Sequence, residues 1–387
     1  MNTASAKPDQ SPAGAAGVSS ASAKKITSIL ALVLIGLAGA AIFAARINPA
    51  RMDYISYWSA AKLLVHHTNP YSSSAYSLEK PLGFLPSHPL IMRNPPWALF
   101  LVAPLGVLGP RAGLFLWTML LGTCIIFSVY LLNPFSKDNA LALLFAPAIA
   151  CIGSGQSSPF LLLGFALFLH FHQRRPFFAG SALLLMAIKP HLFLVFWAVL
   201  LVEAVWRRKF QILAGLASAL AIATVFALAI DFRIWTDYFS MLRQANLGHK
   251  ALPTVSMLLR LLIDPAAFWL TFVPSALAIL WALWYYARNR QAWSWTKHGM
   301  LLILVAIAVS PYSFITDEIV LLPAIIFALN LPEKRKYAGW ILVAINAAAA
   351  IVYTIAAGPL TTPVLVWTPL AWLAWFLYTA KVKVPAE

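Results

Sequence analysis

The chain has 387 residues, of which 61% are hydrophobic and only 10% are charged. Soluble globular domains carry about 25% charged residues, so this composition excludes an ordinary soluble fold and indicates helices whose solvent is largely lipid. The net charge of +16 does not indicate a nucleic-acid partner, because the basic residues lie in short clusters between apolar runs and signal membrane topology instead.

The N-terminal segment predicts a tail followed by a membrane span. Residues 1–23 are mostly small or polar, too poor in large apolar groups to form a core, so we expect a disordered cytoplasmic tail. Lys24 and Lys25 then precede an apolar run over residues 26–47 that is long enough to cross a bilayer. Because positive residues favour the cytoplasmic side, residues 24–387 are expected to form one transmembrane helical domain that starts in the cytoplasm.

The apolar runs predict an all-α polytopic membrane protein. Basic clusters in short connections, such as Arg174 with Arg175, are assigned to the cytoplasm. This assignment places residues 48–111 and 231–265 in outer loops, and it requires Pro95 to Leu108 to be a re-entrant helix. About twelve transmembrane helices follow from these rules, over residues 26–47, 112–132, 140–153, 159–171, 177–189, 191–206, 210–230, 266–287, 299–310, 319–331, 338–357 and 363–380.

Several of the predicted spans are short. Residues 159–171 and 299–310, for example, offer fewer apolar residues than the roughly 20 that a hydrocarbon core needs. We therefore expect such helices either to be extended by polar flanking residues or to border a water-filled cavity, which would open outward. Cys124 and Cys151 lie inside apolar stretches, which indicates buried thiols rather than a disulfide framework or a metal cluster.

The first outer loop contains a carboxylate among aromatic residues. Asp53 follows the first span, and Tyr57 and Trp58 come shortly after it. A carboxylate in this position can accept a proton from an acceptor hydroxyl while the rings stack on sugars. An interfacial aspartate beside an ordinary aromatic belt explains the same pattern, so both interpretations stay open.

Three more ionisable residues are predicted at membrane depth, namely Lys189, Asp317 and Glu318. Charged groups there are costly unless they are paired or face a polar cavity, which makes each a candidate functional residue; snorkelling to the interface is the alternative. Adjacent carboxylates point to different faces of a helix, so Asp317 and Glu318 are not expected to share a metal ion. No metal and no cofactor is predicted.

A set of separated motifs carries a family resemblance. In chain order these are Asp53 with Tyr57, Ala60 with Ala61, Asn69-Pro70-Tyr71, Pro95-Pro96, Gly155-Gln156, Lys189-Pro190, Ser256 with Arg260, and Ser310-Pro311. On these residues the chain resembles glycosyltransferase family 87, which comprises polyprenyl-phosphate-sugar-dependent enzymes of the GT-C fold. Where that family often has His after an aromatic residue, this chain has Thr316, Asp317 and Glu318.

The resemblance implies an inverting sugar transfer with Asp53 as the catalytic base. Inversion at the anomeric carbon also needs a cation on the departing phosphate, for which Lys189 is the first candidate, Arg260 the second, and Arg93 and His191 the next. Substrate contacts are expected from Tyr57, Trp58, Gln156, Asp317 and Glu318. Helix capping explains Gln156 nearly as well as a bond to a sugar hydroxyl does.

The implied donor is a polyprenyl-phosphate sugar, with mannose preferred over arabinofuranose. The implied acceptor is a glycolipid or envelope glycan on the outer face of the cytoplasmic membrane, and membrane lipid is the other expected partner. A secondary transporter or flippase of a lipid-linked sugar is an alternative, although no internal repeat of the kind common in transporters is evident. An envelope glycan ligase also stays open, because the loop over residues 231–265 contains several basic residues.

Overall fold

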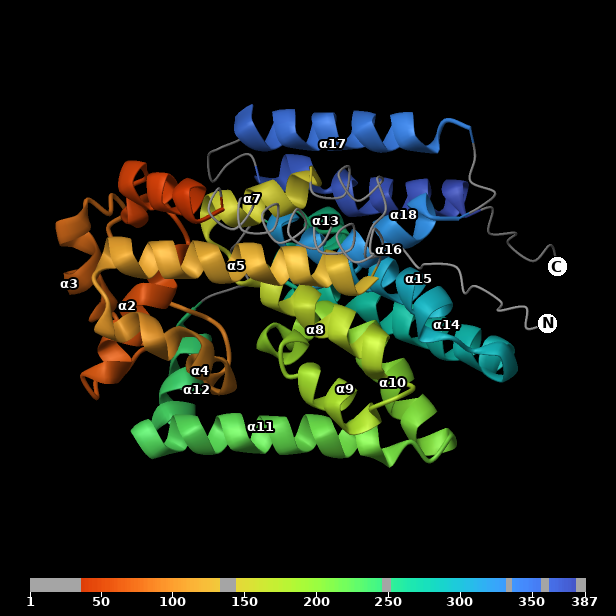
Figure 1. The fold of residues 1–387 in the computed structure, drawn as a ribbon, viewed down its shortest axis with the longest axis horizontal. Coiled ribbons are helices and arrows are strands. Elements are labelled where there is room, and N and C mark those ends of the chain that lie inside the picture. The colour runs from red at the N-terminus through yellow and green to blue at the C-terminus, as the bar shows by residue number, and fades with distance from the viewer. Residues whose placement is uncertain (1–35, 133–143, 246–251, 332–335, 356–361, 381–387) are drawn as a thin grey trace, which may run out of the picture.

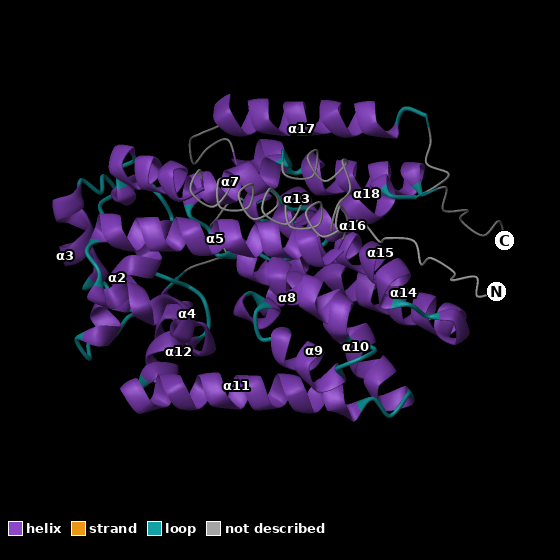
Figure 2. Cartoon of the chain, viewed as in Figure 1, coloured by secondary structure: helices purple, strands orange, loops and turns teal. Residues whose placement is uncertain are grey.

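A computed structural model describes residues 36–132, 144–245, 252–331, 336–355 and 362–380, and these residues contain helices and loops but no strand (Figure 1; Figure 2). The predicted tail over residues 1–23 lies outside the described residues. After a first helix, Gly36–Arg46, the α-helices are α2 (Tyr54–Val65), α3 (Ala75–Glu79), α4 (Leu99–Val102), α5 (Pro110–Leu132), α7 (Ala146–Ser154), α8 (Ser158–Phe171), α9 (Pro176–Ala182), α10 (Leu194–Trp206), α11 (Phe210–Ile230), α12 (Ile234–Gln244), α13 (Val255–Ile263), α14 (Val273–Asn289), α15 (Trp295–Ala308), α16 (Leu322–Leu329), α17 (Ala338–Ile355) and α18 (Trp367–Thr379).

Short 3₁₀ segments connect many of these helices. Those that matter for the site are η1 (Pro49–Arg51), η3 (Pro96–Ala98), η4 (Ala103–Val107), η5 (Met186–Ile188), η6 (Pro190–Phe193), η8 (Phe268–Phe272) and η10 (Ile315–Leu321). Tighter turns of this kind usually occur at helix ends and at breaks, where the regular hydrogen-bond ladder stops. Lys189, for example, lies at the break between η5 and η6.

Four described helices are long and apolar enough to cross a membrane: α5, α11, the segment Phe268–Ala292 around α14, and α17. A fifth span would result if Pro176–Ile188 and Pro190–Trp206, which are bent by 117° relative to each other, counted as one. The prediction of a polytopic helical membrane protein is thus supported, whereas the predicted count of about twelve spans is not confirmed.

The difference in count comes from short helices. The predicted spans over residues 159–171 and 299–310 correspond to α8 and α15, each of 14 residues. At 1.5 Å per residue such a helix extends about 21 Å, less than the roughly 30 Å of hydrocarbon. In Figure 1 these helices lie among the longer ones, so neighbouring helices cover much of their surface.

The predicted re-entrant segment forms η3, α4 and η4, a run of short helices that precedes α5. This run packs closely against α2, because a Cβ built on Gly106 would lie 2.3 Å from the carbonyl oxygen of Ala61. Lys62 donates a hydrogen bond of 3.0 Å to the Gly106 carbonyl at the same contact. The Ala60-Ala61 motif therefore has a packing role, since small residues let the two backbones approach.

An aromatic core holds α8, α10 and α15 together. Phe168 of α8 meets Phe196 of α10 edge to face at a ring separation of 5.5 Å, and it meets Trp295 of α15 in the same way at 5.3 Å. All three side chains are buried. Edge-to-face packing of large rings gives a well-defined geometry, so the C-terminal half of α8 is fixed against α10 and α15.

Candidate active site

One cavity of about 810 Å³ collects side chains from distant parts of the chain. Its walls come from the start of α2, the segment before η3, the turn between α7 and α8, the break between η5 and η6, and the loop before η10. Of the predicted site residues, the ones in these walls are Asp53, Tyr57, Arg93, Gln156, Lys189 and His191. Residues that the sequence predicts on one face of the membrane therefore share one cavity.

The carboxylate of Asp53 lies at the N-terminal end of α2 and accepts a hydrogen bond from Gln156, with Nε2 2.7 Å from Oδ2.

Gln156 is placed by a tight turn, because α7 ends at Gly155 with a φ of 70°. A Cβ built on Gly155 would also lie 2.7 Å from Cβ of Tyr54. Glycine meets both requirements. The indole N–H of Trp117 donates a 2.8 Å hydrogen bond to the Gly155 carbonyl and holds the turn.

The amide of Gln156 has one favourable orientation. Its Oε1 accepts hydrogen bonds from the hydroxyl of Tyr57 at 3.0 Å and from Nζ of Lys189 at 3.1 Å. A flipped amide would place its NH₂ group against the ammonium of Lys189 and its oxygen against the carboxylate of Asp53, and both contacts would be repulsive. The hydrogen-bond network thus determines which end of Gln156 faces Asp53.

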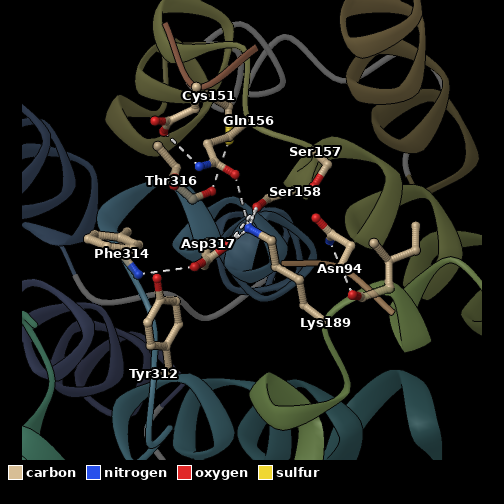
Figure 3. A network of polar contacts seen from close by, with 12 residues as sticks. Asn94, Cys151, Gln156, Ser157, Ser158, Lys189, Tyr312, Phe314, Thr316 and Asp317 are labelled. Atoms are coloured by element: carbon tan, nitrogen blue, oxygen red, sulfur yellow. Dashed lines mark hydrogen bonds and ion pairs between the residues drawn. The ribbon is translucent and has the colours of Figure 1, made fainter. Parts of the chain in front are cut away.

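Lys189 stands at the break between η5 and η6 (Figure 3). Pro190 follows it, and the residue before a proline is kept out of the helical region, so the helix stops and turns there. The carbonyl oxygens of the two residues before Lys189 accept hydrogen bonds from Nδ2 of Asn94 at 3.2 Å and from Nε1 of Trp97 at 2.8 Å. Backbone groups released by the break are in this way satisfied by side chains from the segment around η3.

The ammonium of Lys189 makes three hydrogen bonds, to Oδ1 of Asp317 at 2.7 Å, to Oγ of Ser158 at 3.1 Å and to Gln156. Asp317 also accepts a hydrogen bond from Ser158 at 2.6 Å and one from the backbone N–H of Phe314 at 3.0 Å. Burial alone would raise the pKa of Asp317, but the Lys189 ammonium and these hydrogen bonds lower it below its ordinary value. Asp317 is therefore ionised and paired (Figure 3).

A second polar group in the cavity centres on Tyr312. Its hydroxyl lies 3.5 Å from Nη1 of Arg93, and its ring meets that of His191 edge to face at 5.6 Å. Burial raises the pKa of Tyr312, so the hydroxyl keeps its proton. Among the described residues no carboxylate lies within ion-pair distance of Arg93, and the buried Nε2 of His191 has no hydrogen-bond partner.

Four predicted site residues are not among the described residues that line the cavity: Asp317, which pairs with Lys189, and Trp58, Arg260 and Glu318, which are buried elsewhere. Trp58 donates its indole N–H to a carbonyl oxygen at the end of η4. The guanidinium of Arg260 lies 5.7 Å from the ring of Phe268. Glu318 accepts hydrogen bonds from two side chains of α18, so it faces away from Asp317, as expected for adjacent residues of a helical segment.

The sequence interpretation missed Tyr312, Asn94 and Ser158 as site residues. Each lies within two residues of a recognised motif: Tyr312 comes after Ser310-Pro311, Asn94 precedes Pro95-Pro96, and Ser158 comes two residues after Gln156. Proximity to a motif was therefore the available signal. Their hydrogen-bond partners lie far away in the chain, which local sequence does not reveal.

Comparison with known proteins identifies the family. No curated protein and no solved structure gives a significant match to this chain. The family model for glycosyltransferase family 87 matches residues 93–311, a stretch that begins at Arg93 and includes Gln156, Lys189 and His191. Since this stretch is more than half of the chain, the protein belongs to glycosyltransferase family 87 and is a membrane glycosyltransferase.

Proposed function

We propose that this glycosyltransferase moves a hexosyl residue, with mannose as the preferred sugar, from a polyprenyl-phosphate donor to a glycolipid or envelope-glycan acceptor. The observation that carries the proposal is the carboxylate of Asp53, which Gln156 holds at the wall of a cavity of about 810 Å³. Small-molecule sites commonly have volumes of about 300–1,000 Å³, so this cavity is large enough for a sugar phosphate and an acceptor hydroxyl.

The proposed reaction is one displacement at the anomeric carbon. Asp53 takes the proton of the acceptor hydroxyl while the oxygen of that hydroxyl forms a bond to the anomeric carbon. The bond between the anomeric carbon and the phosphate oxygen breaks, and the electron pair leaves with polyprenyl phosphate. Attack from the face opposite the leaving group inverts the configuration of the sugar.

Arg93, Tyr312 and His191 are the proposed partners of the leaving phosphate. The guanidinium of Arg93 has no carboxylate partner among the described residues, and an arginine can hold two phosphate oxygens at once. The hydroxyl of Tyr312 supplies a further donor beside Arg93, and the ring of His191, whose buried Nε2 has no hydrogen-bond partner among the described residues, lies in the same part of the cavity. Trp58, Arg260 and Glu318 are left out of this site because they do not line the cavity.

The proposed location of the site is the outer face of the cytoplasmic membrane. Its support is the arrangement of charge along the long helices: in Figure 1 the basic connection between α10 and α11, with Arg207 and Lys209, lies toward the right-hand end of the molecule. The helices α2 and α12, which contribute Asp53 and Tyr238 to the cavity, lie toward the left-hand end. Basic clusters favour the cytoplasm, so the cavity belongs to the other side.

The test is incubation of the purified full-length protein with a panel of polyprenyl-phosphate sugars, followed by measurement of released polyprenyl phosphate and of glycosylated acceptor. We expect release with a mannosyl donor, dependence on an acceptor, and loss of release in Asp53→Asn. Failure to release polyprenyl phosphate from any donor would overturn the proposal and favour a transport function for the lipid-linked sugar.

A further inference from the structure

We infer that Lys189 and Asp317 are positioning residues that act through Gln156 on the carboxylate of Asp53, rather than ligands of the donor phosphate. This inference rests on the proposed function, in which Asp53 is the base. The polar chain Asp317–Lys189–Gln156 is continuous, with separations of 2.7 Å from Oδ1 of Asp317 to Nζ of Lys189, 3.1 Å from there to Oε1 of Gln156, and 2.7 Å from Nε2 of Gln156 to Oδ2 of Asp53.

The hydrogen-bond donors of Lys189 are all in use within the protein. An ammonium group carries three N–H bonds, and Lys189 uses them on Asp317, Ser158 and Gln156. A phosphate ligand would have to displace one of these partners. Displacing Asp317 would leave its carboxylate, with 1% of its surface exposed, without the cation that pairs with it. Arg93 faces no such competition from a carboxylate of the described residues.

Lys189 helps to determine which end of the Gln156 amide faces Asp53. The ammonium and the hydroxyl of Tyr57 both point at Oε1, so the NH₂ end must face Asp53. Hydrogen bonds in such a sequence polarise one another, and the short 2.7 Å separation to Asp53 agrees with a strengthened donor. Removing Lys189 would lift one of the two electrostatic reasons for this orientation, the other being the carboxylate of Asp53 itself.

The amide of Gln156 separates the ammonium of Lys189 from the carboxylate of Asp53. A lysine in direct contact with Asp53 would form an ion pair and reduce the affinity of the carboxylate for the acceptor proton. Gln156 orients the carboxylate with a neutral donor, and Asp317 balances the positive charge one link further away. The polar chain Asp317–Lys189–Gln156 thus reaches the base through a neutral donor rather than through direct contact with the ammonium of Lys189.

The surroundings of Asp53 allow a pH test of this arrangement. The titratable groups that interact with it include Tyr57 in α2, Cys151 in α7 and Tyr353 in α17, and His191 lies in the same cavity. Tyrosine and cysteine side chains are neutral at acidic pH, so none of them changes charge between roughly pH 4 and pH 7. Arg51 in η1 is exposed and stays charged throughout. His191 is the same in the native enzyme and in a variant at position 156, so a difference between their acid limbs reports the change beside Asp53.

The decisive variant is Gln156→Glu, with the pH dependence of kcat as the readout. A second carboxylate close to Oδ2 of Asp53 would share a proton with it, so the acid limb should move up by about one pH unit or more. Lys189 would pair with the new carboxylate, which favours folding of the variant. Gln211→Glu at the exposed start of α11 is the matched control and should leave the acid limb unchanged.

A second variant is needed if Gln156→Glu turns over too slowly for the pH dependence of kcat to be measured. The double variant Lys189→Met with Asp317→Asn removes cation and anion together, so no buried charge is left unpaired. Loss of the orienting ammonium should lower kcat by about 10-fold to 100-fold, the scale of a misplaced reacting group, while the KM for the donor changes little. A rise in donor KM with unchanged kcat would instead assign Lys189 to the phosphate and overturn the inference.

Asp53→Asn, measured in parallel, separates this inference from the proposed function. If Asp53→Asn still transfers sugar, Asp53 is not the base and both the proposed mechanism and the positioning role are wrong. If Asp53→Asn is inactive but Gln156→Glu keeps the acid limb of the native enzyme, the base assignment stands and only the positioning role is wrong.

Discussion

Lys189 and Asp317 stand 128 residues apart in the chain, yet Nζ of the lysine lies 2.7 Å from Oδ1 of the aspartate. The pair links the broken helix between η5 and η6 to the segment η10. Its side chains are 14% and 1% exposed, so solvent screens it little. The ion pair therefore contributes to the fold as well as to the geometry of the cavity.

Breaking this pair on one side should destabilise the protein strongly. Lys189→Met or Asp317→Asn alone leaves a buried charge uncompensated, for which about 3–5 kcal/mol is typical. The double variant should lose clearly less than the sum of the two single losses. Denaturant unfolding of the detergent-solubilised variants measures this, and strictly additive losses would contradict a direct pair.

The same pair predicts a direction for the pH dependence of stability. Because the folded-state pKa of Asp317 lies below its ordinary value, its stabilising contribution is fully present above the ordinary aspartate pKa of about 4. The contribution is lost as the pH falls through the lowered value. Unfolding measured at decreasing pH should show an acid-dependent loss of stability that is absent in the double variant Lys189→Met with Asp317→Asn.

Replacing the proposed base should remove activity without removing the fold. Asp53→Asn keeps the size of the side chain at the start of α2, but it cannot take the acceptor proton, and general-base catalysis contributes about 10²–10⁴-fold. Transfer rates and thermal unfolding should be measured on the same preparation. Transfer within a factor of a few of the native rate would refute the assignment.

The turn at Gly155 should tolerate no side chain. Gly155→Ala must adopt a φ near 70° and places its Cβ against Tyr54, so we expect a loss of about 1–3 kcal/mol and displacement of Gln156 with reduced transfer. Gly153→Ala is the control in the same helix, because a Cβ there meets nothing within 4 Å. Alanine at position 153 should be neutral or slightly stabilising; equal losses at both positions would contradict the role given to the turn.

Donor binding should depend on Arg93. Arg93→Ala removes a charged hydrogen-bond donor from the cavity, and such bonds are worth about 1.5–3 kcal/mol, which corresponds to a rise of roughly 10-fold to 100-fold in donor KM. Arg93→Lys should recover part of the loss because the charge remains. Lys80→Ala, which removes an exposed cation that does not line the cavity, should leave donor KM unchanged. Similar donor KM values in all three variants would show that Arg93 does not hold the phosphate.

Several residues of the site were predictable because polar and charged side chains are rare in apolar segments. A carboxylate, an amide and an ammonium at the ends of apolar runs are costly to bury, so Asp53, Gln156 and Lys189 stand out from the sequence. The helical class and membrane location follow from the same cost. Span number was less predictable, since short apolar helices such as α8 satisfy the same composition rules as full spans.

The sequence by itself determined that this is a helical membrane protein with a few ionisable residues of unusual position, because hydrophobic length and charge are local properties. Only the tertiary structure decided which of these residues touch. It separated Asp317, which pairs with Lys189, from its neighbour Glu318, which faces α18, and it placed Gln156 between Lys189 and Asp53. Hydrogen bonds form only between atoms about 3 Å apart, and a local sequence pattern does not reveal which distant residues the fold brings that close.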